Sequence, residues 1–378
     1  MPILFLASCS IVSAKLIPVD QSPLQDRIPL ILIHGIRPAK DKLYDWKPFL
    51  VYAETNPDFS NRYKPYLFIY PPAELIEHNA QTLQQELIQY KTLHPETKPF
   101  RFLAQSLGGI VLRDTLNTPA LWQQTDRVIA LGCAYHGSPL TNSNWMRARL
   151  KQVSFFSKFR RLNRISYWIF GRLFPHYKED LCWDNFDGLM PDEYLKRHVC
   201  QPRVSIHPSE EEVQKYILYA GFFGETPKER ELLRNLLGVP PTVAAKKFTP
   251  PLSRHLITYL IRPDLAYIPL RINSQKSSAK LLMWYNDGVS PIASQLWLGR
   301  YLEKVPRPIP PEGEWQTLGA LKDNPNVRLF EGLDHGDWLK GTTRYRNVDG
   351  KLLDWLHPEQ PPKEVFSWIL ADLVREGK

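Results

Sequence analysis

The sequence lacks long apolar runs and has few cysteines. No run of about 18 consecutive apolar residues occurs in the chain of 378 residues, so we expect no transmembrane helix. The cysteines are too few for a disulfide framework; they are Cys9, Cys133, Cys182 and Cys200. Cys133 ends a predicted buried strand, where we expect it to act as a small apolar residue. Pairing of Cys182 with Cys200 would require export, and the sequence leaves it open.

Acidic residues are missing from one long segment, Trp145–Lys178. It contains nine Lys/Arg and no Asp or Glu, whereas basic and acidic residues balance in the rest of the chain. The net charge of +9 therefore comes from this segment alone. An excess this localised predicts a local anionic partner. The chain has no recognition motif for nucleic acid, so we expect no nucleic-acid partner.

Short apolar runs alternate with helical patterns in the first part of the chain. We expect strands at Ile28–His34, Tyr66–Tyr70, Phe100–Gln105 and Arg127–Gly132. We expect helices at Tyr44–Tyr52, Ala73–Leu93 and Gly108–Leu116. This alternation predicts an α/β fold with a mostly parallel sheet and helices on both of its faces.

The alternation stops after Gly137 and resumes only in pieces. Later strands are predicted at Tyr216–Gly221, Leu281–Tyr285 and Asn326–Phe330, followed by a closing helix at Lys363–Arg375. The stretches between them predict an inserted helical cap at about 142–212 and a second insertion at about 225–278. We therefore divide the chain into an N-terminal tail or truncated signal, 1–25, and one domain, 26–378, that carries both insertions.

Ser106 stands between a predicted strand and a predicted helix, in the stretch FRFLAQSLGGIVL. Ala104 and Gly108 are small enough for a tight strand-to-helix turn, which would expose the serine hydroxyl at the carboxyl end of the sheet. The backbone amide of Leu107, at the start of the helix, would then point at a developing oxyanion. The alternative is an ordinary helix N-cap serine.

A serine nucleophile needs a general base, and the base needs an acid that orients it. His335 lies in a loop directly after the last predicted strand, Asn326–Phe330. Asp287 lies in an Asn-Asp-Gly turn after the predicted strand Leu281–Tyr285. We therefore expect His335 to be the base and Asp287 the acid. The alternatives are a surface loop histidine and an aspartate that only forms the turn.

The loop after the first predicted core strand supplies a second oxyanion donor. It reads His34-Gly35-Ile36, and the backbone amide of Ile36 is the donor we expect beside that of Leu107. We expect His34 itself to be a hydrogen-bonded structural residue and not a base.

These stretches together resemble the bacterial lipases and esterases of the α/β-hydrolase superfamily, in the branch with Ala-x-Ser-x-Gly at the nucleophile. The chain order Ser106, Asp287, His335 is the order of that superfamily. The segment Ala134–Pro139 partly matches the Pro-His-x-Gly-Ser/Thr segment of these lipases, and we interpret His136 in it as structural. The chain departs from them at Gln105, where they commonly have histidine.

The resemblance implies an α/β-hydrolase fold with a large helical cap, and a serine carboxylester hydrolase that requires no cofactor. Ser106 would be the nucleophile, His335 the base and Asp287 the acid. Some of these lipases place a structural calcium ligand two residues after the catalytic histidine, a position that Asp337 occupies here. The alternative for Asp337 is an ordinary surface carboxylate.

The substrate implied by the resemblance is a lipid or another carboxylic ester. Alternatives are a phospholipase or acyltransferase with the same triad, and a catalytically silent member that binds lipid or protein. Aromatic and basic residues are interleaved in Trp145–Lys178, which is typical of a lid that meets an anionic membrane surface. The alternative is a cap helix that buries its aromatic residues on the core. The oligomeric state stays open.

The N-terminus contains a short apolar run that ends at Cys9. Leu6-Ala7-Ser8-Cys9 resembles a bacterial lipoprotein signal, in which the cysteine is lipidated after cleavage, although the run is short and no Lys/Arg precedes it. We therefore expect a protein of the cell envelope or a secreted one, with lipidation at Cys9. The alternatives are a plain apolar tail and a cytoplasmic location.

Overall fold

The computed structural model describes the residues that build one central sheet and the helices around it. These are residues 14–36, 46–72, 74–135, 137–138, 214–222, 287, 289–290, 292–296, 325–331, 333, 335, 338–340, 345–346, 352–353 and 364–375. Several predictions concern residues outside this set and stay predictions. They are Cys9, the cap at about 142–212 with its basic segment, Cys182 and Cys200, the second insertion at about 225–278, the strand Leu281–Tyr285, His136 and Asp337.

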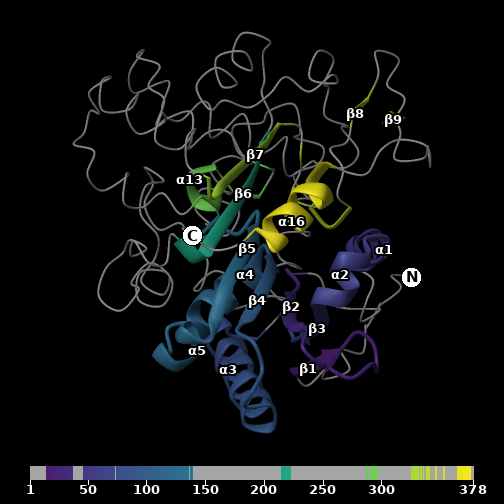
Figure 1. Ribbon diagram of the computed structural model, residues 1–378. Helices are drawn as coiled ribbons and strands as arrows, with labels where there is room; N and C mark the ends of the chain where they lie inside the picture. Colours follow the sequence, from purple (N-terminus) through teal and green to yellow (C-terminus); the bar gives the residue numbers. More distant parts are fainter. Residues whose placement is uncertain are drawn as a thin grey trace, which may run out of the picture.

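Seven strands form one sheet in the order β1-β3-β2-β4-β5-β6-β7 (Figure 1). Their bounds are β1 Lys15–Pro18, β2 Ile28–Ile33, β3 Tyr63–Ile69, β4 Phe100–Gln105, β5 Thr125–Leu131, β6 Tyr216–Phe222 and β7 Val327–Glu331. The edge strand β1 runs antiparallel to β3, and all other neighbours are parallel. A separate antiparallel pair consists of β8, Tyr345–Arg346, and β9, Leu352–Leu353.

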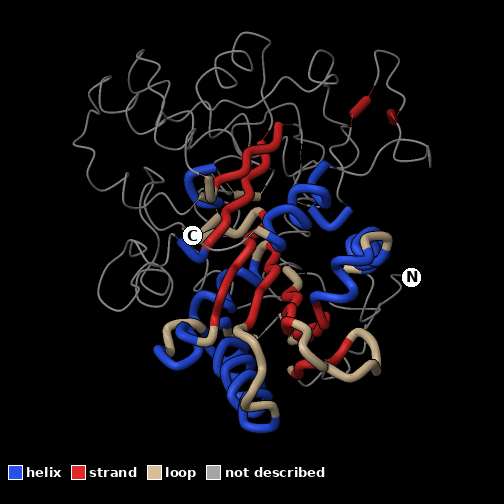
Figure 2. The backbone as a smooth tube through the Cα atoms, viewed as in Figure 1, coloured by secondary structure: helices blue, strands red, loops and turns tan. Residues whose placement is uncertain are grey.

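Helices cover both faces of the sheet (Figure 2). One face is covered by α3 Ile76–Leu93, α4 Leu107–Thr115 and α5 Pro119–Gln123. The other face is covered by α1 Lys47–Glu54, α2 Pro57–Arg62 and α16 Glu364–Val374. Two short elements, α13 Ile292–Gln295 and the 3-10 helix η5 Trp338–Lys340, complete the described helices. A mostly parallel sheet with one antiparallel edge strand, between two helical layers, is an α/β-hydrolase-like arrangement, so the predicted fold class is confirmed for the described residues. The predicted helical cap lies outside them.

Strand β2 shows how the sheet separates two cores. Side chains alternate across a strand, so Ile31 and Ile33 pack with α3 and α4, while Leu30 and Leu32 pack with the helices of the opposite face. All six residues of the strand are buried, as expected of a central parallel strand that is covered on both sides. Such a strand provides a rigid support for the loop that follows it.

The predicted elements agree with the structure where apolar residues recur strongly. The bounds of β4 are those predicted, and β2, β5 and β7 shift by only a few residues. Helix α3 begins at Ile76, later than the predicted Ala73. In β2, β4, β5 and α3 the buried apolar residues produce the pattern on which the prediction was based, whereas among Val327–Phe330 of β7 only Phe330 is buried.

The assignment of 1–25 to a tail was wrong at β1, which belongs to the sheet. This strand has four residues and is partly exposed, so it offers neither an apolar run nor a clear alternation. Helices α2 and α5 were also missed, because both have six or fewer residues and begin with proline. Such short helices contain too few turns for a periodic apolar face.

Candidate active site

Ser106 occupies the turn between β4 and α4 in a strained backbone conformation. Its φ of 55° and ψ of −124° lie in a region that residues other than glycine rarely adopt. Such a conformation costs about 1–3 kcal/mol and persists only where the surroundings impose it. The Ser106 side chain makes no capping hydrogen bond to the helix. The N-cap alternative is therefore wrong, because a capping serine has extended backbone angles and accepts a bond from the first turn.

The turn is possible because backbones approach closely on either side of it. A β-carbon on Gly108 would lie 2.5 Å from the His34 carbonyl oxygen, and one on Gly109 would lie 2.2 Å from the Cys133 sulfur. The Ser106 amide continues the pairing of the sheet by donating to the Leu131 carbonyl at 3.0 Å. Helix α4 thus packs directly against β2 and the end of β5, which holds Ser106 at the carboxyl edge of the sheet.

The structure brings Ser106, His335 and Asp287 into one hydrogen-bonded row. The Nε2 atom of His335 lies 2.6 Å from the Ser106 hydroxyl oxygen, and its Nδ1 atom lies 2.6 Å from Oδ2 of Asp287. Asp287 is 1% exposed, and its Oδ1 accepts backbone N–H bonds from Val289 and Ser290 at 3.0 and 2.9 Å. Because a carboxylate beside these donors only accepts, Nδ1 carries the imidazole proton and Nε2 faces the hydroxyl.

Backbone bonds tie the loops of the acid and the base to each other. The His335 amide donates to the Asp287 carbonyl at 2.8 Å, and the Gln105 side-chain amide donates to the His335 carbonyl at 3.3 Å. His335 is therefore held from both sides, by the acid loop and by the residue before the nucleophile. A surface loop histidine and an aspartate that only forms a turn would not need these bonds. Those two alternatives therefore do not explain the arrangement.

Gln295 on α13 is a supporting residue that the sequence analysis missed. Its side chain accepts from the Gly221 amide at 2.9 Å and donates to the carbonyls of Gly221 and Ser290 at 3.0 and 2.7 Å. It thereby connects the acid loop to β6. Helix α13 has only four residues, so no periodic pattern could have identified it.

The two predicted oxyanion donors, Leu107 and Ile36, lie beside Ser106. Leu107 is the first residue of α4, so its N–H is one of those that have no partner within the helix. Ile36 follows Gly35, whose backbone packs against the nucleophile: a β-carbon there would lie 2.9 Å from Cβ of Ser106. Their roles as oxyanion donors stay predictions.

Two further residues near Ser106 behave as the sequence analysis expected. His34 is buried and its ring bonds to backbone groups, as expected of a hydrogen-bonded residue. Cys133 is also buried, and burial raises the pKa of its thiol to about 12. At neutral pH it is therefore a protonated, apolar residue.

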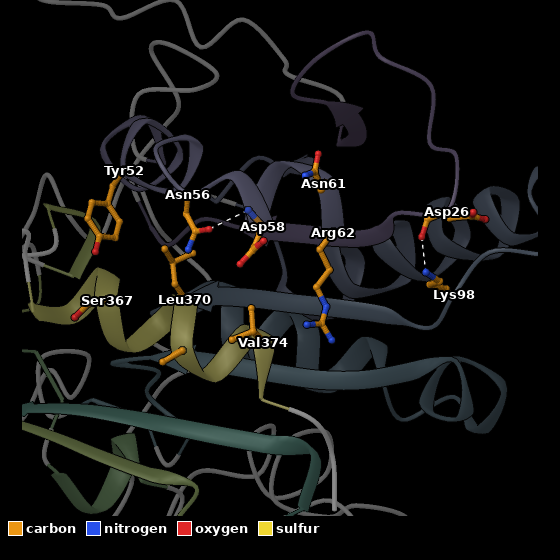
Figure 3. A pocket seen from close by; sticks show the side chains of 11 residues that line it. Asp26, Tyr52, Asn56, Asp58, Asn61, Arg62, Lys98, Ser367, Leu370 and Val374 are labelled. Atoms are coloured by element: carbon orange, nitrogen blue, oxygen red, sulfur yellow. Dashed lines mark hydrogen bonds between the residues drawn. The ribbon is translucent and has the colours of Figure 1, made fainter.

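A hollow of about 660 Å³ lies away from this site (Figure 3). Arg62 and Lys98 line it just before the first residues of β3 and β4, together with Leu370 and Val374 of α16. Ser106 follows the last residue of β4, about 20 Å further along the strand. The hollow is therefore at the opposite edge of the sheet and is not the substrate site of Ser106.

The described residues hold neither a candidate metal site nor a helix that could span a membrane. Within that part of the chain, no three His, Cys, Asp or Glu side chains gather closely enough to bind a metal ion. No described helix combines the length and the apolar character needed to span a bilayer. Asp337, the predicted calcium ligand, is outside the described residues.

No protein-family model matches the chain, and no curated protein matches it in sequence. Its structure is similar to those of bacterial lipases and esterases at low identity. A lipase of Bacillus licheniformis in its mature form is 14% identical, with a TM-score of 0.44 over 86% of this chain and 93% of that one. A lipase-esterase related protein of Clostridium acetobutylicum is 11% identical, with a TM-score of 0.27 over 37% and 54%.

A proline iminopeptidase-related protein of Thermus thermophilus is 14% identical, with a TM-score of 0.29 over 87% of this chain and 89% of that one. Identities and TM-scores this low carry no information about substrate or mechanism. The candidate site is therefore interpreted from its own geometry.

Proposed function

We propose that the protein is a serine hydrolase that cleaves carboxylic esters, with fatty-acyl esters as its substrates. The observation that carries this proposal is the row of hydrogen bonds from Ser106 through His335 to Asp287, built on a serine with strained backbone. A hydroxyl bonded to an imidazole whose other nitrogen faces a buried carboxylate is the arrangement that activates serine as a nucleophile.

In the proposed reaction the Ser106 oxygen attacks the ester carbonyl carbon, and its proton passes to Nε2 of His335. Asp287 stabilises the resulting imidazolium and keeps the ring in place. The negative oxygen of the tetrahedral intermediate accepts hydrogen bonds from the amides of Leu107 and Ile36. The intermediate collapses as His335 protonates the departing alcohol. Water, deprotonated by the same imidazole, then attacks the acyl carbon. As this second tetrahedral intermediate collapses, the bond to the Ser106 oxygen breaks, His335 returns the proton to that oxygen, and the acid is released.

The choice of a lipid ester rests on the sequence of Trp145–Lys178, where basic and aromatic residues are interleaved. The same segment favours a second candidate, a phospholipase or acyltransferase with this triad, because an anionic head group would suit it. A silent lipid- or protein-binding protein is the third. The proposed location is the cell envelope or the exterior, with lipidation at Cys9.

Turnover of p-nitrophenyl esters of increasing acyl length tests the proposal, with Ser106→Ala as the matched variant. We expect the wild type to hydrolyse them and Ser106→Ala to lose about 10⁶ in kcat, the size of loss seen when a triad serine is removed. Hydrolysis by the variant at the wild-type rate would contradict the role of Ser106. A wild type that hydrolyses no ester, phospholipids included, would favour the silent protein.

A further inference from the structure

His34 and Tyr70 form a buried polar pair behind the loop that carries Ile36. His34 follows the last residue of β2, and Tyr70 follows the last residue of the neighbouring strand β3. Both are buried, and their rings stack with centroids 4.3 Å apart and planes 11° from parallel. The Tyr70 hydroxyl donates to the His34 carbonyl at 2.7 Å. The proposed reaction uses neither side chain as an acid or a base.

The partners of the His34 ring determine where its proton lies. Nδ1 is 2.7 Å from the Gly35 carbonyl oxygen, which only accepts, so Nδ1 carries the hydrogen. Nε2 is 3.4 Å from the Tyr70 backbone nitrogen, which donates, so Nε2 is the acceptor. This network assigns a neutral imidazole with its proton on Nδ1.

The bond from Nδ1 holds a whole peptide group. The Gly35 carbonyl and the Ile36 N–H belong to the same planar unit, and in a trans peptide the two groups point in opposite directions. With the carbonyl held toward the His34 ring, the Ile36 N–H is turned away from it. The Gly35 backbone also packs against the nucleophile, since a β-carbon there would meet Gln105 and Ser106 at 2.3 and 2.9 Å.

We infer that His34, backed by Tyr70, is a positioning residue that aims the Ile36 amide at the oxyanion formed on Ser106. The inference rests on the proposed function. Negative charge develops on the substrate oxygen in the transition state and not in the bound ester. A misdirected donor therefore raises the free energy of the transition state more than that of the bound ester. Loss of the His34 contacts should therefore lower kcat and leave KM nearly unchanged.

The test compares His34→Phe with His34→Asn. Phenylalanine keeps a flat ring that stacks on Tyr70 but removes both ring hydrogen bonds, whereas asparagine returns a donor near the position of Nδ1. We expect His34→Phe to lower kcat about 10- to 100-fold with KM within about twofold, less than the loss of a donor outright because the amide remains. The affinity for a trifluoromethyl ketone, whose adduct carries the oxyanion, should fall by the same factor as kcat. His34→Asn should recover most of both losses.

Three results would overturn the inference: kcat of His34→Phe within twofold of wild type, unchanged ketone affinity, or no recovery in His34→Asn. The thermal midpoint of each variant is measured alongside. If His34→Phe does not fold, Tyr70→Phe decides, since it removes only the hydroxyl. A several-fold lower kcat at constant KM supports the inference, and an unchanged kcat overturns it. A wild type that hydrolyses no ester overturns the proposed function as well, whereas an active wild type with an equally active His34→Phe overturns the inference alone.

Discussion

The carboxyl edge of the sheet, where the parallel strands end, and the amino edge, where they begin, carry polar clusters that are built in opposite ways. At the carboxyl edge, the hydroxyl of Ser106 bonds to His335, which bonds in turn to Asp287, and the Ser106 backbone is strained. The amino-edge cluster, by contrast, binds the end of α16 to the starts of the strands; it consists of Arg101, Arg127, Tyr219, Arg328 and Asp372.

In the amino-edge cluster every member outside α16 has a hydrogen-bond partner at the end of that helix. Arg328 pairs with Asp372 at 2.7 Å, and the Tyr219 hydroxyl donates to the same carboxylate at 2.6 Å. Arg101 and Arg127 donate to the backbone carbonyls of Leu373 and Asp372. Cations at the carbonyl end of a helix are stabilising, because the helix dipole is negative there.

The difference separates stability from the proposed chemistry. The amino-edge cluster satisfies its charged groups with hydrogen-bond partners and holds no hydroxyl beside a basic nitrogen. The carboxyl edge keeps a strained serine and a hydroxyl whose partner is a basic nitrogen. Substitutions at the two edges should therefore change different measurements, and the following predictions test that separation.

Among the substitutions that compare the two edges, the largest effect should come from Asp287→Asn. The amide that replaces the carboxylate can donate to Nδ1, which favours the wrong imidazole tautomer, so we expect kcat to fall about 10⁴-fold. The thermal midpoint should change little, because the shape of the side chain is retained. Measured ester turnover and thermal unfolding check this, and a loss of kcat under tenfold would show that Asp287 does not orient the base.

Asp372→Asn should have the converse effect. It leaves the partly buried Arg328 without its counter-charge and puts an amide in the buried position of the carboxylate, so the free energy of unfolding should fall by about 3 kcal/mol, while kcat per folded molecule stays near wild type. Urea unfolding measures the loss, with Asp58→Asn, an exposed carboxylate on α2, as the matched control. Equal losses in both variants would mean that the amino-edge cluster contributes no special stability.

Sequence patterns pointed to the residues at the carboxyl edge but not to those at the amino edge. Ser106, Asp287 and His335 each follow or end a strand pattern, so chemistry and chain order were enough to select them. Arg101 and Arg127 instead interrupt apolar strands, and their partners lie 272 and 245 residues away in α16. No local pattern encodes such a contact. Gln295 was missed for the same reason, because its bonds reach Gly221 of β6, 74 residues earlier in the chain.

The strain at Ser106 should be measurable as a difference in the free energy of unfolding between two variants. Ser106→Gly and Ser106→Ala both remove the hydroxyl, but only glycine adopts a φ of 55° without cost. Glycine also gives the unfolded chain more entropy, which offsets part of this advantage. The net result should be a free energy of unfolding about 1 kcal/mol higher for Ser106→Gly than for Ser106→Ala. Urea unfolding of the two variants checks this. A less stable glycine variant would show that the turn is not strained.

The smallest effect concerns the pH dependence of Tyr219. Burial, together with the adjacent Asp372 carboxylate, raises the pKa of Tyr219 well above 10.0. Its contribution is therefore full below the unfolded pKa, near pH 10, and declines as pH rises beyond that value.

Tyr219→Phe should lower the free energy of unfolding by about 1 kcal/mol at pH 8, the usual value of one hydrogen bond. The difference from wild type should shrink at about pH 11. Urea unfolding at the two pH values checks this, and a difference that grows with pH would contradict the assigned direction.

The most direct test of the central claim is the site of covalent labelling by a fluorophosphonate, located by peptide mass spectrometry. We expect one adduct on the native protein, on the peptide that contains Ser106, and none in Ser106→Ala. Asp287→Asn should be labelled much more slowly, because its base is misoriented. An adduct on another residue, or a folded wild type that stays unlabelled, would contradict the assignment of Ser106 as an activated nucleophile.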